Sequence, residues 1–306
     1  DSWIWQDSLR GAEEYGSMGS ATQYNTAITD GVQKFLAGGF STEDNDAINT
    51  SGESYVAYNF HLNGGTTTTD TSGTLSTELQ ANAAAGFSVG KFTVSGSGNV
   101  TWAHGLGGVP EMGILCAYNS TNYGTTYHHK ISTTPYSNGL FLINTDGAFT
   151  SSNIWGSAKP TSTLWTGLVG SLFSAGEPYI FYSFRGIEGF SKFGSYTGNG
   201  NSDGPFVYTG FRPAMVMVKS SSNAGTGWEI RDNKRSASGG NNPITQVLYP
   251  YLTQSELTTD NCDFLANGFK WRSSGGNRNE SGYTYIYMAF AEHPFVGDGT
   301  NPVTAR

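Results

Sequence analysis

A ten-residue stretch that occurs three times limits what this chain can fold into more than any other feature. The copies cover residues 51–60, 175–184 and 281–290, and each has a small residue and a glycine ahead of an aromatic and β-branched run. Such runs are typical of β-strands. Side chains alternate between the two faces of a strand, and one face is apolar in every copy and ends on Phe60, Phe184 or Phe290. The recurrence predicts repeated units in which these phenylalanines occupy equivalent buried positions.

Two further landmarks fix the register of the repeats. The pattern Trp-x3-Asp-x2-Arg occurs as Trp3, Asp7 and Arg10, then as Trp228, Asp232 and Arg235, with a degenerate middle version in Tyr123, Tyr127 and Lys130. The pattern Phe-Leu-Ala-x-Gly-Phe occurs at 35–40 and 264–269. A Trp and an Arg spaced in this way can lock a sheet edge by stacking and an ion pair. We favour this structural role over a ligand site for Trp3, Trp228, Asp232 and Arg235, because binding sites tend to diverge among repeats.

The landmarks divide the chain into units. We predict a partial β unit at 1–63 (unit 1), a Thr- and Ala-rich linker at 64–85, complete β units at 86–188 (unit 2) and 189–296 (unit 3), and a tail at 297–306. Frequent short strands separated by Gly, Asn and Ser turns indicate an all-β fold of tandem β-sandwich or jelly-roll-like units. The linker is expected to be exposed and extended. Short helical turns are expected only near 27–36 and 243–251.

The composition agrees with a folded β protein and excludes several classes. Charged residues make up 13% of the chain, aromatic residues 14%, and 42 residues are Gly. This mixture is typical of a turn-rich β protein and not of a disordered chain. A net charge of -8 without a run of Lys or Arg argues against nucleic-acid binding, and no apolar run is long enough to insert in a membrane. Cys116 and Cys262 fall at unrelated places in their units and give no clear signal of redox compartment.

Motifs that carry chemistry are largely missing. The neighbours His128 and His129 would point to opposite faces of a strand and could not share a metal ion. Asp44 to Asp46 resembles the start of a calcium loop but lacks the later ligands. Neither a nucleophile elbow nor an acid–base carboxylate pair is visible, although folding can bring distant carboxylates together. We therefore expect no catalytic residue, metal or cofactor.

Tryptophans outside the repeated framework are the candidates for ligand contact. Indole rings stack on sugars and other flat ligands, and Trp155, Trp165 and Trp271 belong to no landmark. We predict that they bind glycan, with burial in the core as the alternative for each.

The motifs resemble the β-rich repeat domains in tail fibres and other virion surface proteins of marine phages, cyanophages among them. The resemblance is carried by residues 189–200, 203–214, 232–235, 263–269 and 289–295 together with Trp228. It is close over 186–306 and looser over 86–185 and 1–63. The resemblance implies a virion component on the tail, baseplate or head, and it brings no catalytic residues.

The expected function is a phage virion structural protein, a tail fibre or surface fibre that contacts host-cell glycan. The alternatives are a depolymerase that cuts the polysaccharide, and a capsid or baseplate decoration or connector without a receptor role. The expected partners are other virion proteins, further copies of the chain with a trimer first, and host surface polysaccharide. Unit 1 has only two residues ahead of Trp3, so we expect its opening strands to lie upstream in a longer polypeptide, or a neighbouring subunit to cover the gap.

Overall fold

The computed structural model describes residues 3–294 apart from 13, 18–25, 28, 37, 63–65, 119–123, 133–140, 144–152, 157, 171–172 and 237–238. Within these residues the predicted all-β, sandwich-like fold is confirmed, with strands arranged in antiparallel sheets. In the described part of the chain, helix is limited to two single turns, α1 (Asp46–Asn49) and α3 (Gly276–Asn279). No helix of the described chain is long and apolar enough to cross a membrane.

Unit 2 is built around a seven-stranded sheet. Its strand order is β12 (Phe141–Leu142), β11 (Thr125–His128), β10 (Met112–Ala117), β14 (Pro178–Phe184), β8 (Phe87–Thr93), β7 (Thr77–Asn82) and β6 (Thr68–Asp70). The pair β9 (Asn99–Ala103) and β13 (Leu164–Leu168) forms a second layer. The core between the layers contains Leu79, Phe92, Trp102, Trp165 and Phe181.

Unit 3 is a sandwich of two four-stranded sheets. The first has the order β15 (Ser191–Thr197), β22 (Thr284–Ala291), β17 (Pro213–Ser220) and β18 (Glu229–Asp232). The second has the order β16 (Phe206–Tyr208), β21 (Gly268–Trp271), β20 (Leu257–Leu265) and β19 (Ile244–Val247). The core between them contains Val207, Val216, Phe264, Phe269 and Trp271.

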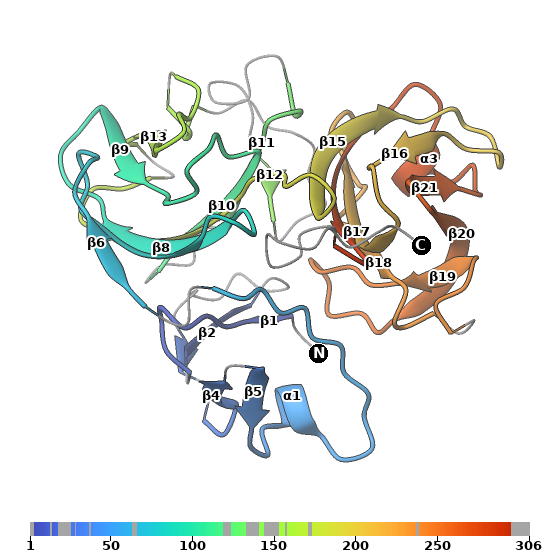
Figure 1. The fold of residues 1–306 in the computed structure, drawn as a ribbon, viewed down its shortest axis with the longest axis horizontal. Helices are drawn as coiled ribbons and strands as arrows, with labels where there is room; N and C mark the ends of the chain where they lie inside the picture. Colours follow the sequence, from blue (N-terminus) through green and yellow to red (C-terminus); the bar gives the residue numbers. More distant parts are fainter. Residues whose placement is uncertain are drawn as a thin grey trace, which may run out of the picture.

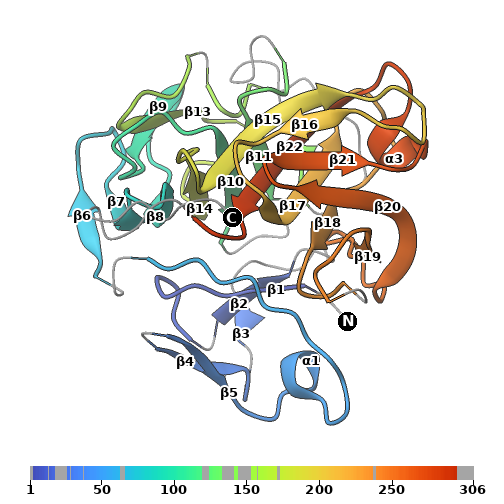
Figure 2. The same ribbon diagram turned by 45° about the vertical axis from the view of Figure 1, so that its right-hand side comes forward.

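The described part of unit 1 consists of short elements. These are a three-stranded sheet of β1 (Ile4–Trp5), β2 (Glu14–Ser17) and β3 (Thr26–Ala27), and a hairpin of β4 (Val32–Leu36) and β5 (Gly39–Thr42). Residues 51–60, the first copy of the repeated stretch, belong to no strand. Figures 1 and 2 show unit 1 below units 2 and 3, with the chain after α1 running along the boundary between the lobes.

The other two copies of the repeated stretch are central strands. β14 lies between β8 and β10, and β22 lies between β15 and β17. One face of each strand faces the core of its own unit, with Phe181 on β14 and Tyr287 on β22. The other face, with Tyr182 and Met288, joins a third core shared by all three units. The apolar face that we identified in the sequence is therefore the face on which the units pack against one another.

Two expectations about local structure are wrong. Residues 66–85 are no exposed linker, because β6 and β7 extend the large sheet of unit 2 and Leu75 and Leu79 are buried there. The segments expected to contain helical turns, 27–36 and 243–251, contain the strands β4 and β19 and no helix among their described residues. The tail 297–306 lies outside the described residues.

In unit 2 the counterpart of the motif aspartate lies one residue later than Tyr127, the position that the sequence pattern predicts. Met112 on β10 pairs with both Phe184 and His128, while Met215 on β17 pairs with both Phe290 and Asp232. The register therefore makes His128, not Tyr127, the counterpart of Asp232. Tyr123 lies outside the described residues. The two cysteines occupy different cores, Cys116 in the shared core and Cys262 in that of unit 3, and form no disulfide.

Candidate functional site

The three phenylalanines that end the repeated stretches meet at one point. The ring centroid of Phe60 lies 5.7 Å from that of Phe184 and 5.2 Å from that of Phe290. Phe87, the first residue of β8, lies 4.9 Å from both Phe60 and Phe184. The three repeated residues thus converge in one shared aromatic cluster instead of filling three separate cores.

Phe60 is less buried than the prediction required. It is 36% exposed, whereas Phe184 is 5% exposed and Phe290 is partly buried. The prediction of three equivalent buried positions is therefore wrong for Phe60. The physical reason is that β14 and β22 have strands on both sides, while residues 54–60 have none among the described residues.

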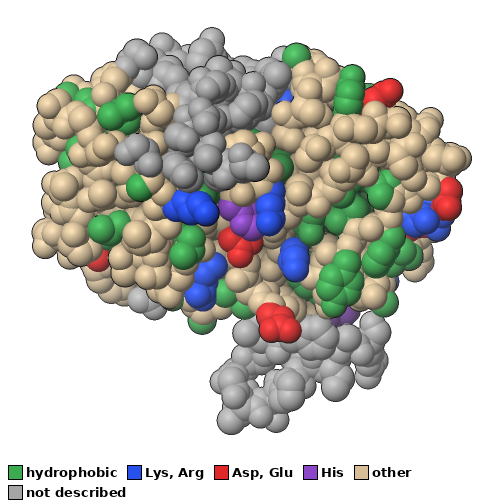
Figure 3. Space-filling view, turned by 90° about the horizontal axis from the view of Figure 1, so that it is seen from above, with side chains coloured by type: hydrophobic (Ala, Val, Ile, Leu, Met, Phe, Trp, Pro, Cys, Tyr) green, Lys and Arg blue, Asp and Glu red, His purple; other side chains and the backbone are tan. Residues whose placement is uncertain are grey.

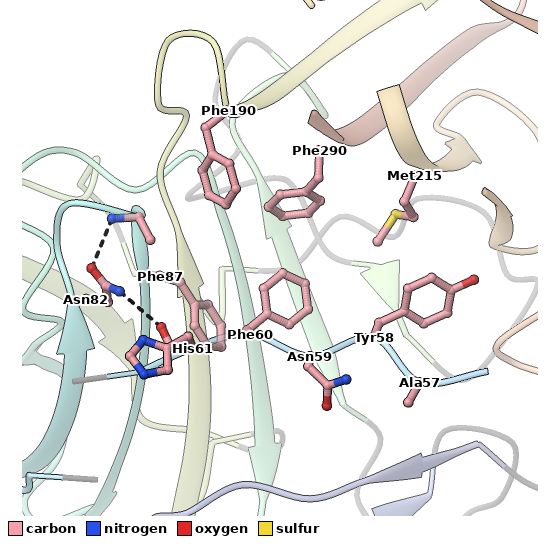
Figure 4. Close-up of a pocket in the computed structure, with 11 residues that line it drawn as sticks. Ala57, Tyr58, Asn59, Phe60, His61, Asn82, Phe87, Phe190, Met215 and Phe290 are labelled. Atoms are coloured by element: carbon pink, nitrogen blue, oxygen red, sulfur yellow. Dashed lines mark hydrogen bonds between the residues drawn. The ribbon is translucent and has the colours of Figure 1, made fainter. Parts of the chain in front are cut away.

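A pocket of about 400 Å³ opens beside this cluster (Figure 4). It is lined by Ala57, Tyr58, Asn59, Phe60, His61, Asn82, Ala85, Phe87, Phe190, Met215 and Phe290. Asn82 closes one end, where its amide donates to the carbonyl oxygen of His61 (3.1 Å) and its side-chain oxygen accepts from the backbone of Ala85 (3.1 Å). The lining is mostly apolar, so the pocket suits an aromatic or aliphatic group and not acid–base chemistry.

The first Trp-x3-Asp-x2-Arg motif connects unit 1 to unit 2. Arg10 donates to the Asp7 carboxylate at 2.6 Å, and Asp7 also accepts from the backbone of Leu9 and Arg10. The Tyr182 hydroxyl on β14 donates to Asp7 (2.8 Å) and accepts from Arg10 (2.9 Å). Burial raises the pKa of Tyr182 well above its usual range and keeps the hydroxyl protonated.

The second motif connects unit 3 to unit 1 in the same way. Arg235 donates to Asp232 at 2.6 Å, and the Tyr58 hydroxyl donates to the same carboxylate at 2.5 Å. Burial opposes the charge of Asp232, but the bonds from Tyr58 and Arg235 outweigh burial and lower the pKa of this carboxyl. Trp3 stacks on Tyr58 with ring centroids 6.1 Å apart.

His128 makes the third connection, from unit 2 to unit 3. Its Nδ1 accepts from the backbone of Lys130 (3.1 Å), as Asp232 accepts from the backbone two residues on. Its Nε2 lies 3.2 Å from the carbonyl oxygen of Tyr287 on β22 and donates to it. Burial, with a smaller effect of His129, lowers the pKa of His128 to about 3. Each unit therefore contacts the next in cyclic order, and the ring of contacts closes within one chain.

The predicted glycan-binding tryptophans lie in the interior. Trp155, Trp165 and Trp271 are 2%, 1% and 1% exposed. The indole nitrogen of Trp165 donates to Ser183 (2.8 Å), and that of Trp271 donates to the Tyr196 hydroxyl (2.7 Å). The prediction that they bind glycan is wrong, because their ring faces are covered by the cores that they fill.

A buried ionic cluster in unit 3 was not identified from the sequence. Arg231 and Arg278 each approach the Glu229 carboxylate to 2.6 Å, and all three residues are at most 2% exposed. Their guanidinium carbons lie 5.4 and 5.8 Å from the centre of the Trp271 ring. Burial opposes ionisation of Glu229, but the two guanidinium groups outweigh it and lower the pKa of the carboxyl. The cluster is sealed from solvent and holds β18 to α3, and no motif links Arg278 to Glu229 in the sequence.

A second group of charges lies at the surface between units 2 and 3. Figure 3 shows Lys and Arg side chains gathered around a His and an acidic side chain on one face. Glu111 interacts electrostatically with Lys192, Lys130 and Arg185, and its carboxylate lies 3.7 Å from His129 Nε2. Burial raises the pKa of Glu111 and lowers that of His129. Among the described residues no group of three or more His, Cys, Asp or Glu side chains could hold a metal ion.

Comparison with known families identifies a family for the chain but no activity. No curated protein matches the chain, and no solved structure matches it. A family described as "Domain of unknown function (DUF7483)" matches residues 1–294, which include all three copies of the repeated stretch. The chain therefore belongs to the DUF7483 family of domains of unknown function.

Proposed function

We propose that the protein is a structural component of a phage particle, where it forms part of a tail fibre or another surface fibre. The proposal begins with the resemblance of residues 186–306 to virion repeat domains. The observation that supports it most directly is the cyclic set of contacts through Asp7, His128 and Asp232, which fixes three units in one arrangement. A module with its interior filled by aromatic side chains suits a structural role better than one that must open around a substrate.

The alternatives differ in their support. A depolymerase has the least, because the interior carboxylates Asp7 and Glu229 are paired with arginines and the aromatic pocket offers no acid–base pair. A decoration or connector role without receptor contact gains support from the burial of the three candidate tryptophans.

Contact with host polysaccharide is the second candidate function, and a different pair of aromatic residues supports it. Phe206 and Tyr208 on β16 are 45% and 60% exposed. They are two positions apart, so their side chains leave the same face of the strand from Cα atoms about 7 Å apart. Lys270, the cross-strand partner of Phe206, pairs with Asp203 (2.9 Å), which places hydrogen-bonding groups beside the rings. Aromatic rings flanked by such groups can stack on sugars.

Purified phage particles test the structural proposal. We expect the chain to be identified in them by mass spectrometry and its antibody to label the particle surface in electron micrographs. The mass of the particle-derived protein tests the proposed homo-oligomer, with a trimer expected first. Absence of the chain from purified particles would overturn the proposal. Release of reducing ends from host polysaccharide by the protein would instead support the depolymerase.

A further inference from the structure

The Phe-Leu-Ala-x-Gly-Phe hairpin occurs twice and is buried to very different extents. Phe264 and Phe269 in the β20–β21 hairpin are 1% and 0% exposed, whereas Phe35 and Phe40 in the β4–β5 hairpin are 40% and 38% exposed. The two hairpins have the same register, since Phe35 pairs with Phe40 as Phe264 pairs with Phe269. The same residues in the same local geometry therefore differ in what covers them.

In unit 3 the cover comes from the opening strands. Val207 on β16 and Val216 on β17 pack in one core with the two phenylalanines of the hairpin. Among the described residues, unit 1 has no counterpart of β15, β16 or β17. Its uncovered large apolar side chains are Phe35, Leu36, Phe40, Tyr55 and Phe60. Large apolar side chains left exposed in this way provide area that a binding partner can cover.

The backbone of residues 54–60, in the first copy of the repeated stretch, also lacks partners within the described chain. Of the backbone groups of residues 54–61, the only one with a hydrogen bond in the described chain is the His61 carbonyl, which accepts from the Asn82 side chain. The corresponding strands β14 and β22 are paired on both sides. Tyr55 is 46% exposed, whereas its counterparts Tyr179 and Tyr285 are 2% and 0% exposed. An extended segment with free backbone groups is a template for strand addition.

The pocket identifies what such a strand would carry. In unit 2 the opening residue Phe87 pairs with Phe184, and in unit 3 the ring of the opening residue Phe190 lies 5.8 Å from that of Phe290. Phe87 lies 4.9 Å from Phe60 as well, but among the described residues unit 1 supplies no opening phenylalanine of its own; the pocket of about 400 Å³ opens beside Phe60 and is lined by both Phe87 and Phe190. A cavity of roughly 150 Å³ lined by apolar side chains is enough to admit benzene. The pocket in Figure 4 therefore has room for one more phenylalanine ring.

We propose that unit 1 binds an extended polypeptide segment of the opening-strand type, Gly-Phe-Ser followed by alternating residues as in 86–93 and 189–196. The segment adds a strand beside residues 54–60 and places its phenylalanine in the pocket beside Phe60. Backbone hydrogen bonds supply the affinity, and the phenylalanine sets the register. The pairing of β8 with β14 and of β15 with β22 supplies the geometry for this contact.

A peptide with the sequence of residues 86–93 tests the proposal on the purified chain. We expect saturable binding by fluorescence anisotropy and slower hydrogen exchange of the amides of residues 54–60, with exchange in β14 and β22 unchanged. The same peptide with Phe87→Ala is expected to bind at least about tenfold more weakly, because it loses a buried ring. Ala57→Pro in the chain removes a backbone donor from an exposed, unpaired position and is expected to weaken binding without unfolding the protein.

Other results would overturn the proposal. These are no binding at millimolar peptide, or binding that neither Phe87→Ala in the peptide nor Ala57→Pro in the chain weakens. Self-association that protects residues 54–60 without peptide would assign the surface to a second copy instead. Protection of 54–60 by a host polysaccharide would assign it to a glycan. The experiment uses the isolated chain, so its outcome is independent of whether the protein is part of a phage particle.

Discussion

Tyr58 donates a hydrogen bond of 2.5 Å to Asp232, which lies 174 residues further along the chain. Tyr182 makes the corresponding bond of 2.8 Å to Asp7, 175 residues earlier. In both cases the same carboxylate binds the arginine and the backbone of its own turn. One side chain therefore fixes the local turn and the packing of the next unit together, which explains why the motif recurs.

Removing these hydroxyl groups is expected to destabilise the protein. Tyr58→Phe and Tyr182→Phe each leave a carboxylate without one donor, which should lower the free energy of unfolding by about 1–3 kcal/mol. Urea denaturation measures both effects, with Tyr208→Phe at an exposed position as the control. A loss no larger than that of the control would show that the contacts between units do not stabilise the fold.

The ionic cluster in unit 3 should be sensitive to loss of its carboxylate. Glu229→Gln leaves two buried guanidinium groups without a counter-charge and is expected to cost about 3–5 kcal/mol. The control is Glu78→Gln, which breaks the half-exposed pair of Glu78 with Lys91 and should leave stability close to that of the wild type. Equal denaturation midpoints for the two variants would contradict the importance of the cluster.

Glycines opposite aromatic residues should resist substitution. Gly90 pairs with Phe181 on β14, and a Cβ added to it would lie 2.4 Å from the ring; Gly194 pairs with Tyr287 on β22, and its Cβ would lie 2.6 Å from the hydroxyl. Both rings are buried and cannot move away freely. Gly90→Ala and Gly194→Ala should each cost about 1–3 kcal/mol by overpacking. Gly39→Ala, where the added Cβ meets nothing within 4 Å, is the control for thermal unfolding. Melting temperatures equal to that of the Gly39 variant would rule the effect out.

The local alternation of the strands could be predicted from the sequence, but the partners of each face could not. Period-two alternation separated Tyr182 from Phe181 correctly, because it depends only on backbone geometry. The surface that covers Tyr182 depends on how the units pack against one another, and the residues next to Tyr182 in the sequence do not determine this packing. The same limit explains the tryptophans: an indole outside the repeated motifs can fill a core or bind a ligand, and only the tertiary structure distinguishes the two for Trp165 and Trp271.

The site at the junction was missed for a related reason. Phe60 ends the same kind of repeated stretch as Phe184, yet no strand of the described chain pairs with residues 54–60, and Phe60 is left 36% exposed. The sequence does not reveal His128 as the counterpart of Asp232, because His128 is neutral and Asp232 is negatively charged at neutral pH. Both side chains nevertheless accept a hydrogen bond from the backbone amide two residues further along the chain. The strand register therefore shows that His128 and Asp232 are equivalent, whereas their residue types do not.

Two buried histidines should make the stability depend on pH. Burial lowers the pKa of His128 to about 3 and that of His104 to about 4, and each Nδ1 accepts a backbone hydrogen bond that protonation would remove. In the unfolded chain a histidine has a pKa of about 6.5. Below this value the unfolded state binds a proton that the folded state does not bind, so the free energy of unfolding falls as the pH falls. Above about pH 6.5 both states are neutral and the contribution to stability is complete.

The slope of this dependence gives the test. Each buried histidine should contribute about 1.4 kcal/mol per pH unit between roughly pH 6 and 4.5. His128→Asn keeps an acceptor for the backbone of Lys130 and removes the titrating group, so its slope in this window should be lower by that amount. Because wild type and variant share every other group, including Glu111 with its raised pKa, the difference between the two slopes belongs to His128. Urea denaturation at several pH values measures it, and parallel curves for the two proteins would mean that His128 is already protonated in the fold.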